Sequence, residues 1–221
     1  MKLILYYAPR TCALVPFVTL TEARAEFEVR NLNSRAGDLK TPEYLKINPK
    51  HKVPVLLIDG EPLTENVAIQ IWISREFPAA RLLPVDPKSE IKAISLMAWF
   101  SSTIHPHLTP NARPENYCDL PGSEEAVKRV GNKLLFQDLA IADGLLAGRE
   151  FFFDHFTAVD AYFFWCFRRG LSFTLDLSRF GNCAAHFDCM QLRPSVQKVF
   201  AHEKQVLDQF AKTGTSAQAR V

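Results

Sequence analysis

The chain has 221 residues, enough for one or two domains with a substantial core, so disordered, collagen-like and disulfide-stapled small proteins are excluded. Its 26 Lys and Arg against 24 Asp and Glu give a formal charge of +2, without any run of five like charges. The sequence therefore carries no electrostatic signature of a partner nucleic acid or an anionic membrane. Five irregularly spaced cysteines without a C-x-x-C pair predict neither a disulfide framework nor a metal site.

The chain also lacks the sequence features of a targeted or membrane protein. Its N-terminal apolar stretch is too short for a signal peptide. The longest uninterrupted apolar run, residues 161–167, is far below the roughly 20 residues that a membrane helix needs. We therefore expect a cytoplasmic protein in a reducing compartment, with no membrane partner.

The first 80 residues alternate between strand and helix patterns. Short apolar or alternating runs ended by turn residues indicate strands, and capping residues followed by apolar periodicity indicate helices. The predicted elements are a strand over 3–7, a helix capped by Thr11, a strand over 27–32, a helix starting at Pro42, a strand over 53–58 entering an Asp59-Gly60 hairpin, and a helix after Asn66.

Beyond residue 88 the pattern is helical, with helices predicted over 89–104, 123–146, 157–169 and 195–210. Thr157-x-x-Asp160 is a capping-box pattern, which serves folding and not chemistry. Residues 214–221 read as a frayed tail. The sequence thus predicts an α/β domain over 1–78 in the order β-α-β-α-β-β-α, a proline-bearing linker over 79–88 and an all-α domain over 89–221.

Several segments resemble the cytosolic glutathione transferases, most closely their bacterial beta-type branch, which has a cysteine soon after the first strand. The segments are YYAPRTCAL at 6–14, NPKHKVPVL at 48–56, LTENVAI at 63–69, IHP at 104–106 and FTAVDAY at 156–162. The resemblance implies a thioredoxin-like, glutathione-binding domain followed by a helical domain with a hydrophobic co-substrate pocket. It also implies a homodimer.

The activity implied by this resemblance is conjugation of the glutathione thiolate to a small hydrophobic electrophile, a detoxification reaction with glutathione as co-substrate and no metal. Two alternatives remain open at this point. One is a glutathione-dependent thiol-disulfide reductase, lyase or dehalogenase that uses Cys12 as a nucleophile. The other is a binding protein that shares the fold without turnover.

Cys12 is the first catalytic candidate. It falls in the first turn of the predicted first helix, where the helix dipole and free N–H groups favour a thiolate, so its pKa is expected below the free value of about 8.5. The alternative is a small packing residue. Val15 stands where a thioredoxin-type enzyme has its resolving cysteine. Tyr7 and Thr11 compete with Cys12, because related branches hold the glutathione thiolate with a hydroxyl group.

The resemblance implies a cis peptide at Val53-Pro54, which leaves the Val53 backbone free to pair with the cysteinyl part of glutathione. Lys52 would neutralise the glycine carboxylate, or be an ordinary solvated lysine. Glu65 and Asn66 open the third helix, where backbone N–H groups suit the γ-glutamyl carboxylate and the Glu65 carboxylate suits the ammonium group. The alternative for this pair is plain helix capping.

His105 is the remaining catalytic candidate. The sequence places it at the end of the first helix of the second domain, directly before Pro106, and the resemblance implies a role in polarising or positioning the glutathione thiol. His107 lies more than half a helical turn further round, which makes the pair a poor metal chelate, so we expect His107 to be a surface residue.

Overall fold

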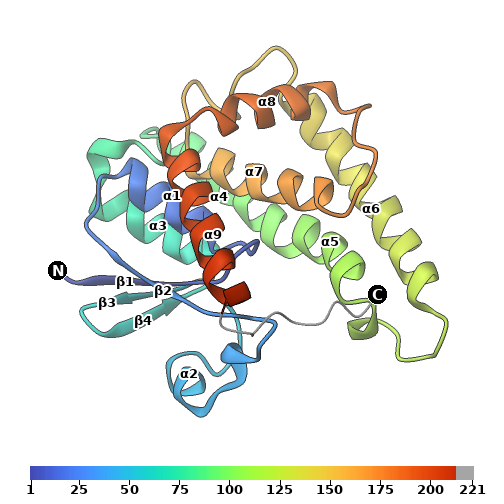
Figure 1. Cartoon of the computed structure of the whole chain (residues 1–221). Coiled ribbons are helices and arrows are strands. Elements are labelled where there is room, and N and C mark those ends of the chain that lie inside the picture. Colours follow the sequence, from blue (N-terminus) through green and yellow to red (C-terminus); the bar gives the residue numbers. More distant parts are fainter. Residues whose placement is uncertain (213–221) are drawn as a thin grey trace. The chain divides into compact units, whose positions relative to one another are not determined.

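The computed structural model describes residues 1–212, which form two compact units. The first unit contains residues 1–82 and 193–212, and the second contains residues 83–192 (Figure 1). The chain therefore leaves the first unit after Leu82 and returns to it at Arg193. The last predicted helix groups with the α/β unit and not with the helical domain expected over 89–221, whereas the tail expected at 214–221 lies outside the described residues.

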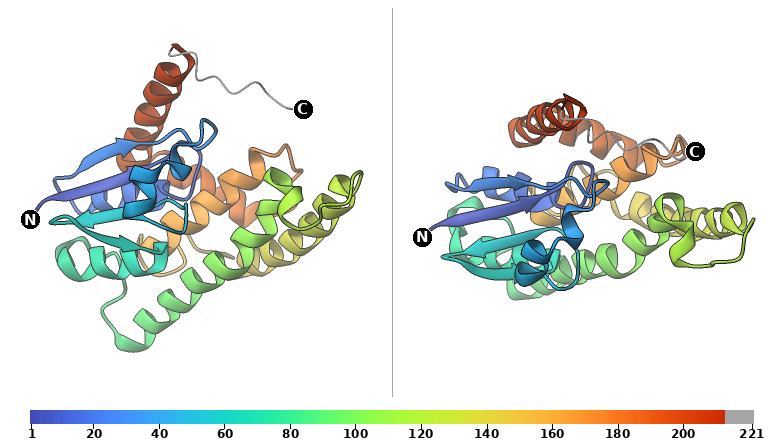
Figure 2. Two further views of the ribbon diagram at one scale, coloured as in Figure 1. Left: turned by 90° about the horizontal axis from the view of Figure 1, so that it is seen from below. Right: turned by 60° about the horizontal axis from the view of Figure 1, so that its bottom comes forward.

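A four-stranded sheet forms the centre of the first unit. The strands lie side by side in the order β2-β1-β3-β4, with β1 parallel to β2 and the other pairs antiparallel (Figure 2). The predicted order β-α-β-α-β-β-α is confirmed. The elements are β1 (Leu3–Tyr7), α1 (Leu14–Glu22), β2 (Glu28–Asn31), α2 (Pro42–Ile47), β3 (Val55–Ile58), β4 (Glu61–Thr64), α3 (Asn66–Glu76) and, from the end of the described chain, α9 (Pro194–Lys212).

The central strand β1 is buried on both faces, as its continuous apolar run requires. Successive side chains of a strand point to opposite faces, so Tyr6 and Tyr7 separate. The Tyr6 ring packs edge-on against Tyr44 of α2, with 5.6 Å between the ring centroids, and the Tyr7 ring packs against Phe17 of α1 at 5.7 Å. Tyr6 is therefore a core residue, and only Tyr7 lies on the side of the sheet that α1 covers.

The turn between β3 and β4 is the predicted hairpin. Asp59 and Gly60 both have positive φ angles, 49° and 96°, as a two-residue turn of this kind requires. The Asp59 carboxylate also accepts a hydrogen bond of 2.6 Å from the Lys2 backbone N–H. Strand β3 begins at Val55, two residues later than predicted, since Pro54 has no N–H to donate to the ladder.

Helix α9 packs on α1 and fixes the carboxyl end of the described chain to the first unit. The Arg193 guanidinium lies 3.0 Å from the Glu22 carboxylate, and His202 Nε2 lies 2.8 Å from the Asn31 side-chain oxygen. The buried face of α9 follows the 3.6-residue period of a helix. The residues buried along this face are Ser195, Val196, Val199, Glu203 and Val206.

The second unit is helical, as predicted. Its helices are α4 (Pro87–Trp99), α5 (His105–Ala112), α6 (Glu124–Leu145), α7 (Ala158–Leu171) and α8 (Gly181–Gln191). Helix α8 was not predicted from the sequence. Helix α7 is buried along most of its length, and Thr157 and Asp160 form the predicted capping box at its start. Among residues 1–212, no helix is long and apolar enough to cross a membrane.

Candidate active site

The loop between β1 and α1 carries Thr11 and Cys12. The Thr11 hydroxyl donates a 2.7 Å hydrogen bond to the Ala8 carbonyl and accepts one of 3.3 Å from the Ala13 N–H, so it closes the loop on itself. Because the regular helix begins at Leu14, Cys12 lies just before the helix and not in its first turn, where the sequence placed it. The Thr11 hydroxyl is thus already used in shaping the loop that holds Cys12.

The Cys12 thiol is directed at the segment before β3. Its sulfur lies 3.5 Å from the Val53 carbonyl oxygen, to which the thiol donates, and the residue is 8% exposed. The Asn66 side-chain amide donates a 2.9 Å hydrogen bond to the Cys12 carbonyl. These contacts bring Cys12, Val53 and Asn66 together from three separate segments of the first unit.

The expected lowering of the Cys12 pKa is wrong. Burial raises the pKa of the Cys12 thiol to about 12, and the positive charge of Lys52 and the hydrogen bond from Asn66 offset only part of this effect. Desolvation penalises the thiolate more than nearby dipoles favour it. At neutral pH Cys12 is therefore a neutral thiol in the absence of ligand.

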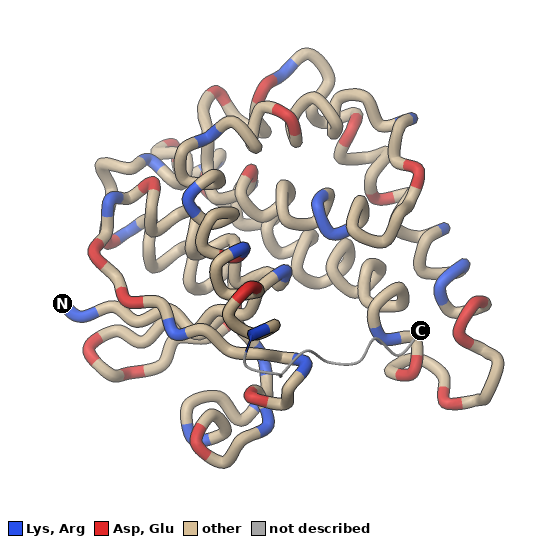
Figure 3. Tube along the Cα trace, viewed as in Figure 1, with Lys and Arg blue, Asp and Glu red and all other residues tan. Residues whose placement is uncertain are grey.

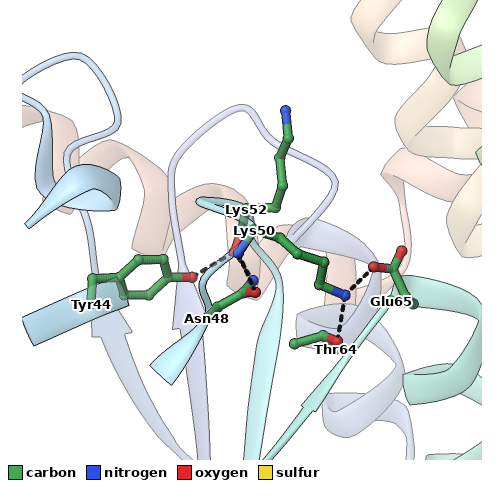
Figure 4. A network of polar contacts seen from close by, with 6 residues as sticks. All are labelled: Tyr44, Asn48, Lys50, Lys52, Thr64 and Glu65. Carbon is green, nitrogen blue, oxygen red and sulfur yellow. Dashed lines mark hydrogen bonds and ion pairs between the residues drawn. The ribbon is translucent and has the colours of Figure 1, made fainter. Parts of the chain in front are cut away.

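The segment before β3 is fixed through its backbone. The Val53-Pro54 peptide is cis, as the resemblance implied. The Lys52 carbonyl accepts hydrogen bonds from the Tyr44 hydroxyl at 2.6 Å and the Asn48 side chain at 2.7 Å (Figure 4). The Lys52 side chain is exposed and points away from the other labelled groups of that view. Its backbone is thus held while its ammonium group is available to an anion.

Glu65 joins strand β4 to helix α3 with a φ of 70°, a region that non-glycine residues enter at a cost of roughly 1 kcal/mol or more. Its exposed carboxylate pairs with the Lys50 ammonium, which also donates a 2.7 Å hydrogen bond to the Thr64 hydroxyl (Figure 4). The Glu65 side chain does not cap the helix. The first backbone N–H groups of α3 therefore have no capping side chain from this residue.

The Asn66 side chain makes two hydrogen bonds within the first unit. Its side chain is buried, where it donates to the Cys12 carbonyl and accepts a 3.3 Å hydrogen bond from Gln70. Its amide group therefore links helix α3 to the loop of Cys12. The start of α3 also offers backbone N–H groups to an anion.

Tyr7 is fully buried, and its hydroxyl donates a 2.8 Å hydrogen bond to the Glu203 carboxylate of α9. The same carboxylate oxygen accepts a 2.7 Å hydrogen bond from the Arg10 backbone N–H. Arg10 has a φ of 63°, so Glu203 holds a strained residue of the loop in place. The tyrosine proton expected to hold a glutathione thiolate is therefore given to Glu203.

His105 belongs to the second unit. The sequence predicted that the first helix of this unit ends at His105. The helix instead continues, because residues 100–104 form a π-helical turn that runs into α5. The wider turn lets the helix pass Pro106, which lacks an N–H. The His105 ring lies 4.5 Å from the Trp165 ring centroid. His107 is not a free surface residue: its Nδ1 lies 2.6 Å from the largely buried Asp138 carboxylate.

Comparison with known proteins identifies the family. Residues 1–75 match the family described as glutathione S-transferase, N-terminal domain. Over 203 residues the chain is 30% identical to glutathione S-transferase GstA of Escherichia coli O157:H7. This alignment covers 90% of this chain and 98% of that protein. The chain belongs to the glutathione S-transferase family. The resemblance seen in the sequence, the transferase activity and glutathione as co-substrate are thereby confirmed.

Solved structures agree with the fold of this transferase. A bacterial beta class enzyme from Sphingomonas chungbukensis is 29% identical, with a TM-score of 0.78 over 90% of this chain and 98% of that one. A sphingomonad glutathione S-transferase complexed with glutathione is 26% identical, with a TM-score of 0.80 over 91% and 98%. The predicted thioredoxin-like domain followed by helices is therefore confirmed.

Two partners in the transferase had no signal in the local sequence. Lys50 pairs with Glu65. Glu203, which lies 196 residues after Tyr7, accepts the hydrogen bond of the Tyr7 hydroxyl. The signal for Glu203 is its position on the buried face of an amphipathic helix, where an acid requires a partner. In residues 1–212, no group of three or more His, Cys, Asp and Glu side chains is arranged to hold a metal ion.

Proposed function

We propose that the transferase conjugates the glutathione thiolate to a small hydrophobic electrophile at the site built around Cys12, Val53 and Glu65. The Val53 backbone pairs with the cysteinyl part of glutathione, and the Lys52 ammonium neutralises its glycine carboxylate. The start of α3 receives the γ-glutamyl carboxylate, and the Glu65 carboxylate its ammonium group. The observation that carries this proposal is the contact of the Cys12 sulfur with the Val53 carbonyl, which puts a thiol beside the backbone expected to bind the tripeptide.

The proposed role of Cys12 is that of a neutral thiol whose S–H turns from the Val53 carbonyl to the glutathione sulfur when glutathione binds. Its raised pKa argues against a resting nucleophile, and the Tyr7 and Thr11 hydroxyls donate to Glu203 and Ala8 instead. His105 remains a proposed thiol-positioning group. The glutathione sulfur then forms a bond to the electrophilic carbon as the thiol gives up its proton. The leaving group departs with the bonding electron pair and that proton, or an activated alkene takes the proton up.

The alternative activities differ in what they require of Cys12. A reductase, lyase or dehalogenase that uses Cys12 as a nucleophile needs the thiolate. Reductase activity toward a mixed glutathione disulfide that Cys12→Ser abolishes would support it. Conjugation of an aryl halide that survives Cys12→Ser would argue against it. Retention on immobilised glutathione without turnover of any electrophile tested would instead indicate a binding protein.

Glutathione affinity should depend on Glu65. A charge-assisted contact between its carboxylate and the ligand ammonium is worth about 1.5–3 kcal/mol, so Glu65→Ala should weaken binding by about one to two orders of magnitude in titration calorimetry. Glu61→Ala is the matched control, since Glu61 is an exposed glutamate of β4, and it should bind like the wild type. Equal affinity of the two folded variants would remove Glu65 from the site.

We also propose a cytoplasmic homodimer. None of the five cysteines, which all lie within residues 1–212, forms a disulfide, as expected in a reducing compartment. Three apolar side chains at helical spacing on α6, Val130, Ile141 and Leu145, are 55%, 56% and 44% exposed, which favours a partner surface on this face. Sedimentation should give twice the 25.0 kDa chain mass. Replacing Val130 and Ile141 with Asp should shift the mass toward the monomer, whereas a monomeric wild type at micromolar concentration would contradict the proposal.

A further inference from the structure

Helix α3 carries two amide side chains on its buried face. Asn66 and Gln70 are buried there, and they alternate with the fully buried Ile69 and Ile73. Residues 66–74 include no Lys, Arg, Asp or Glu, so this stretch of the trace is tan in Figure 3. An apolar side chain at position 70 would continue the stripe that a packed helix presents to a core. The amide of Gln70 therefore departs from the pattern that packing alone favours.

The two amides form a directed chain of hydrogen bonds that ends at Cys12. The Gln70 Nε2 group donates at 3.3 Å to the Asn66 side-chain oxygen, and the Asn66 Nδ2 group donates at 2.9 Å to the Cys12 carbonyl. The same carbonyl accepts a 3.1 Å hydrogen bond from the Val15 N–H. Consecutive hydrogen bonds in a buried chain polarise and strengthen one another. We call this chain from Gln70 through Asn66 to Cys12 the amide relay.

Gln70 determines which way round the Asn66 amide lies. The Cys12 carbonyl can only accept, so it requires the Nδ2 end of Asn66, whereas the Gln70 Nε2 group can only donate, so it requires the Oδ1 end. If the Asn66 amide turned by half a turn, two acceptors would face each other at Cys12 and two donors would face each other at Gln70. The amide of Gln70 thus keeps the Asn66 donor directed at the loop of Cys12.

Stability does not explain why position 70 is a glutamine. The Gln70 Oε1 atom is buried and has no hydrogen-bond partner among residues 1–212. A buried polar atom without a partner destabilises a fold, and an apolar side chain of the same length would avoid this loss. Departures from the core pattern that have no gain in stability are expected at functional sites. The partner of Gln70 in the relay, Asn66, leads to such a site.

We propose that Gln70 is a positioning residue of the transferase, which acts through Asn66 to hold the Cys12 backbone so that its sulfur faces the segment of Val53. This inference rests on the proposed role of Cys12 in the reaction. Only the torsion about the Cα–Cβ bond separates the Cys12 backbone from its sulfur, so a fixed backbone leaves the sulfur few positions. A displacement of about 1 Å at a reacting centre is enough to lower a rate substantially.

The relay also acts on the acidity of Cys12. Burial raises the pKa of the Cys12 thiol to about 12, and a hydrogen bond from the Asn66 side chain opposes this effect. Loss of that donor, or of its orientation, therefore leaves a smaller fraction of thiolate at any pH below the pKa. The charges of Lys52 and Glu65, which also act on this thiol, are the same in variants of Asn66 and Gln70. The alkylation rate of Cys12 thus measures the relay without turnover.

The test is alkylation of Cys12 by iodoacetamide at pH 10 in the ligand-free full chain, followed by mass spectrometry. Asn66→Ala should slow the reaction about tenfold, since a donor to the thiolate is lost. Gln70→Met, which keeps the length of the side chain and removes its amide, should slow it about threefold. Ser74→Ala is the matched control, because it removes a 2.7 Å hydrogen bond to the Gln70 carbonyl on the same helix but leaves the relay intact. It should react like the wild type.

The double variant separates positioning from general packing. If Gln70 acts through Asn66, Gln70→Met should cause no further loss in the Asn66→Ala background. Conjugation of an aryl halide by Gln70→Met should fall in kcat, with the KM for glutathione within about twofold of the wild type. Additive losses in the two variants, or a wild-type alkylation rate in Gln70→Met, would overturn this inference alone. Full conjugation by Cys12→Ser would overturn it together with the proposed function.

Discussion

Iodoacetamide should alkylate Cys118 much faster than Cys12 in the folded, ligand-free transferase. The thiolate is the reacting species, and burial raises the pKa of Cys12 to about 12. Relative to an ordinary thiol, whose pKa is about 8.5, this reduces the thiolate fraction at neutral pH by roughly a thousandfold. Cys118 is partly exposed, and hydrogen bonds from Ser123 and the Leu120 backbone lower its pKa. The two rates therefore differ by several orders of magnitude.

Mass spectrometry of tryptic peptides at timed intervals measures both rates in one sample. The Cys12 rate should rise about tenfold for each pH unit through pH 10, because its thiol titrates only near pH 12, whereas the Cys118 rate should level off below the usual range. Cys118→Ser confirms the peptide assignment. A Cys12 rate that levels off near pH 7 would mean that the helix start does activate this thiol after all.

Asp160→Ala should unfold the second unit at a much lower temperature than the wild type. The Asp160 side chain is fully buried and accepts hydrogen bonds from the backbone N–H groups of Thr157 at 2.7 Å and Phe152 at 3.0 Å. It also lies 3.2 Å from Nε2 of the buried His186, whose other ring nitrogen has no hydrogen-bond partner among the described residues. Truncation therefore leaves several buried polar groups without a hydrogen-bond partner, which lowers the free energy of unfolding by about 3–5 kcal/mol.

For a chain of this length, such a loss lowers the melting temperature by roughly 10 °C. Asp154→Ala is the matched control, because the Asp154 side chain is 80% exposed in the same loop and its pairing with His155 is worth little. Asp160→Asn, which keeps one acceptor oxygen, should fall between the two and serves if the alanine variant does not fold. Calorimetric midpoints of Asp160→Ala and the wild type within 2 °C would refute the assignment.

The sequence predicted those parts of the fold that depend on neighbouring residues. Strand β1, the Asp59-Gly60 hairpin and the capping box of Asp160 each follow from local pattern and turn chemistry. The third helix was predicted likewise. Helix α8 was missed, because its Gly181 start and mixed composition give no clear apolar stripe.

Properties that depend on burial or on distant partners could not be predicted. The Cys12 pKa follows from desolvation that only the folded chain imposes, so local helix geometry gave the wrong sign. The π-helical turn before His105 depends on how the helix accommodates Pro106. The contact of Tyr7 with Glu203 joins opposite ends of the chain, and no spacing rule reaches that far.

That last contact also has a consequence for biosynthesis. Residue 7 leaves the ribosome early, but its hydrogen-bond partner is made 196 residues later. At 5–20 residues per second the loop that carries Cys12 waits roughly 10–40 s for the helix that fixes it. Strand β1 can pair with the β3–β4 hairpin in the meantime, because β4, the last of these strands, ends at Thr64. The nascent chain therefore completes the proposed glutathione site only after Glu203 has been made.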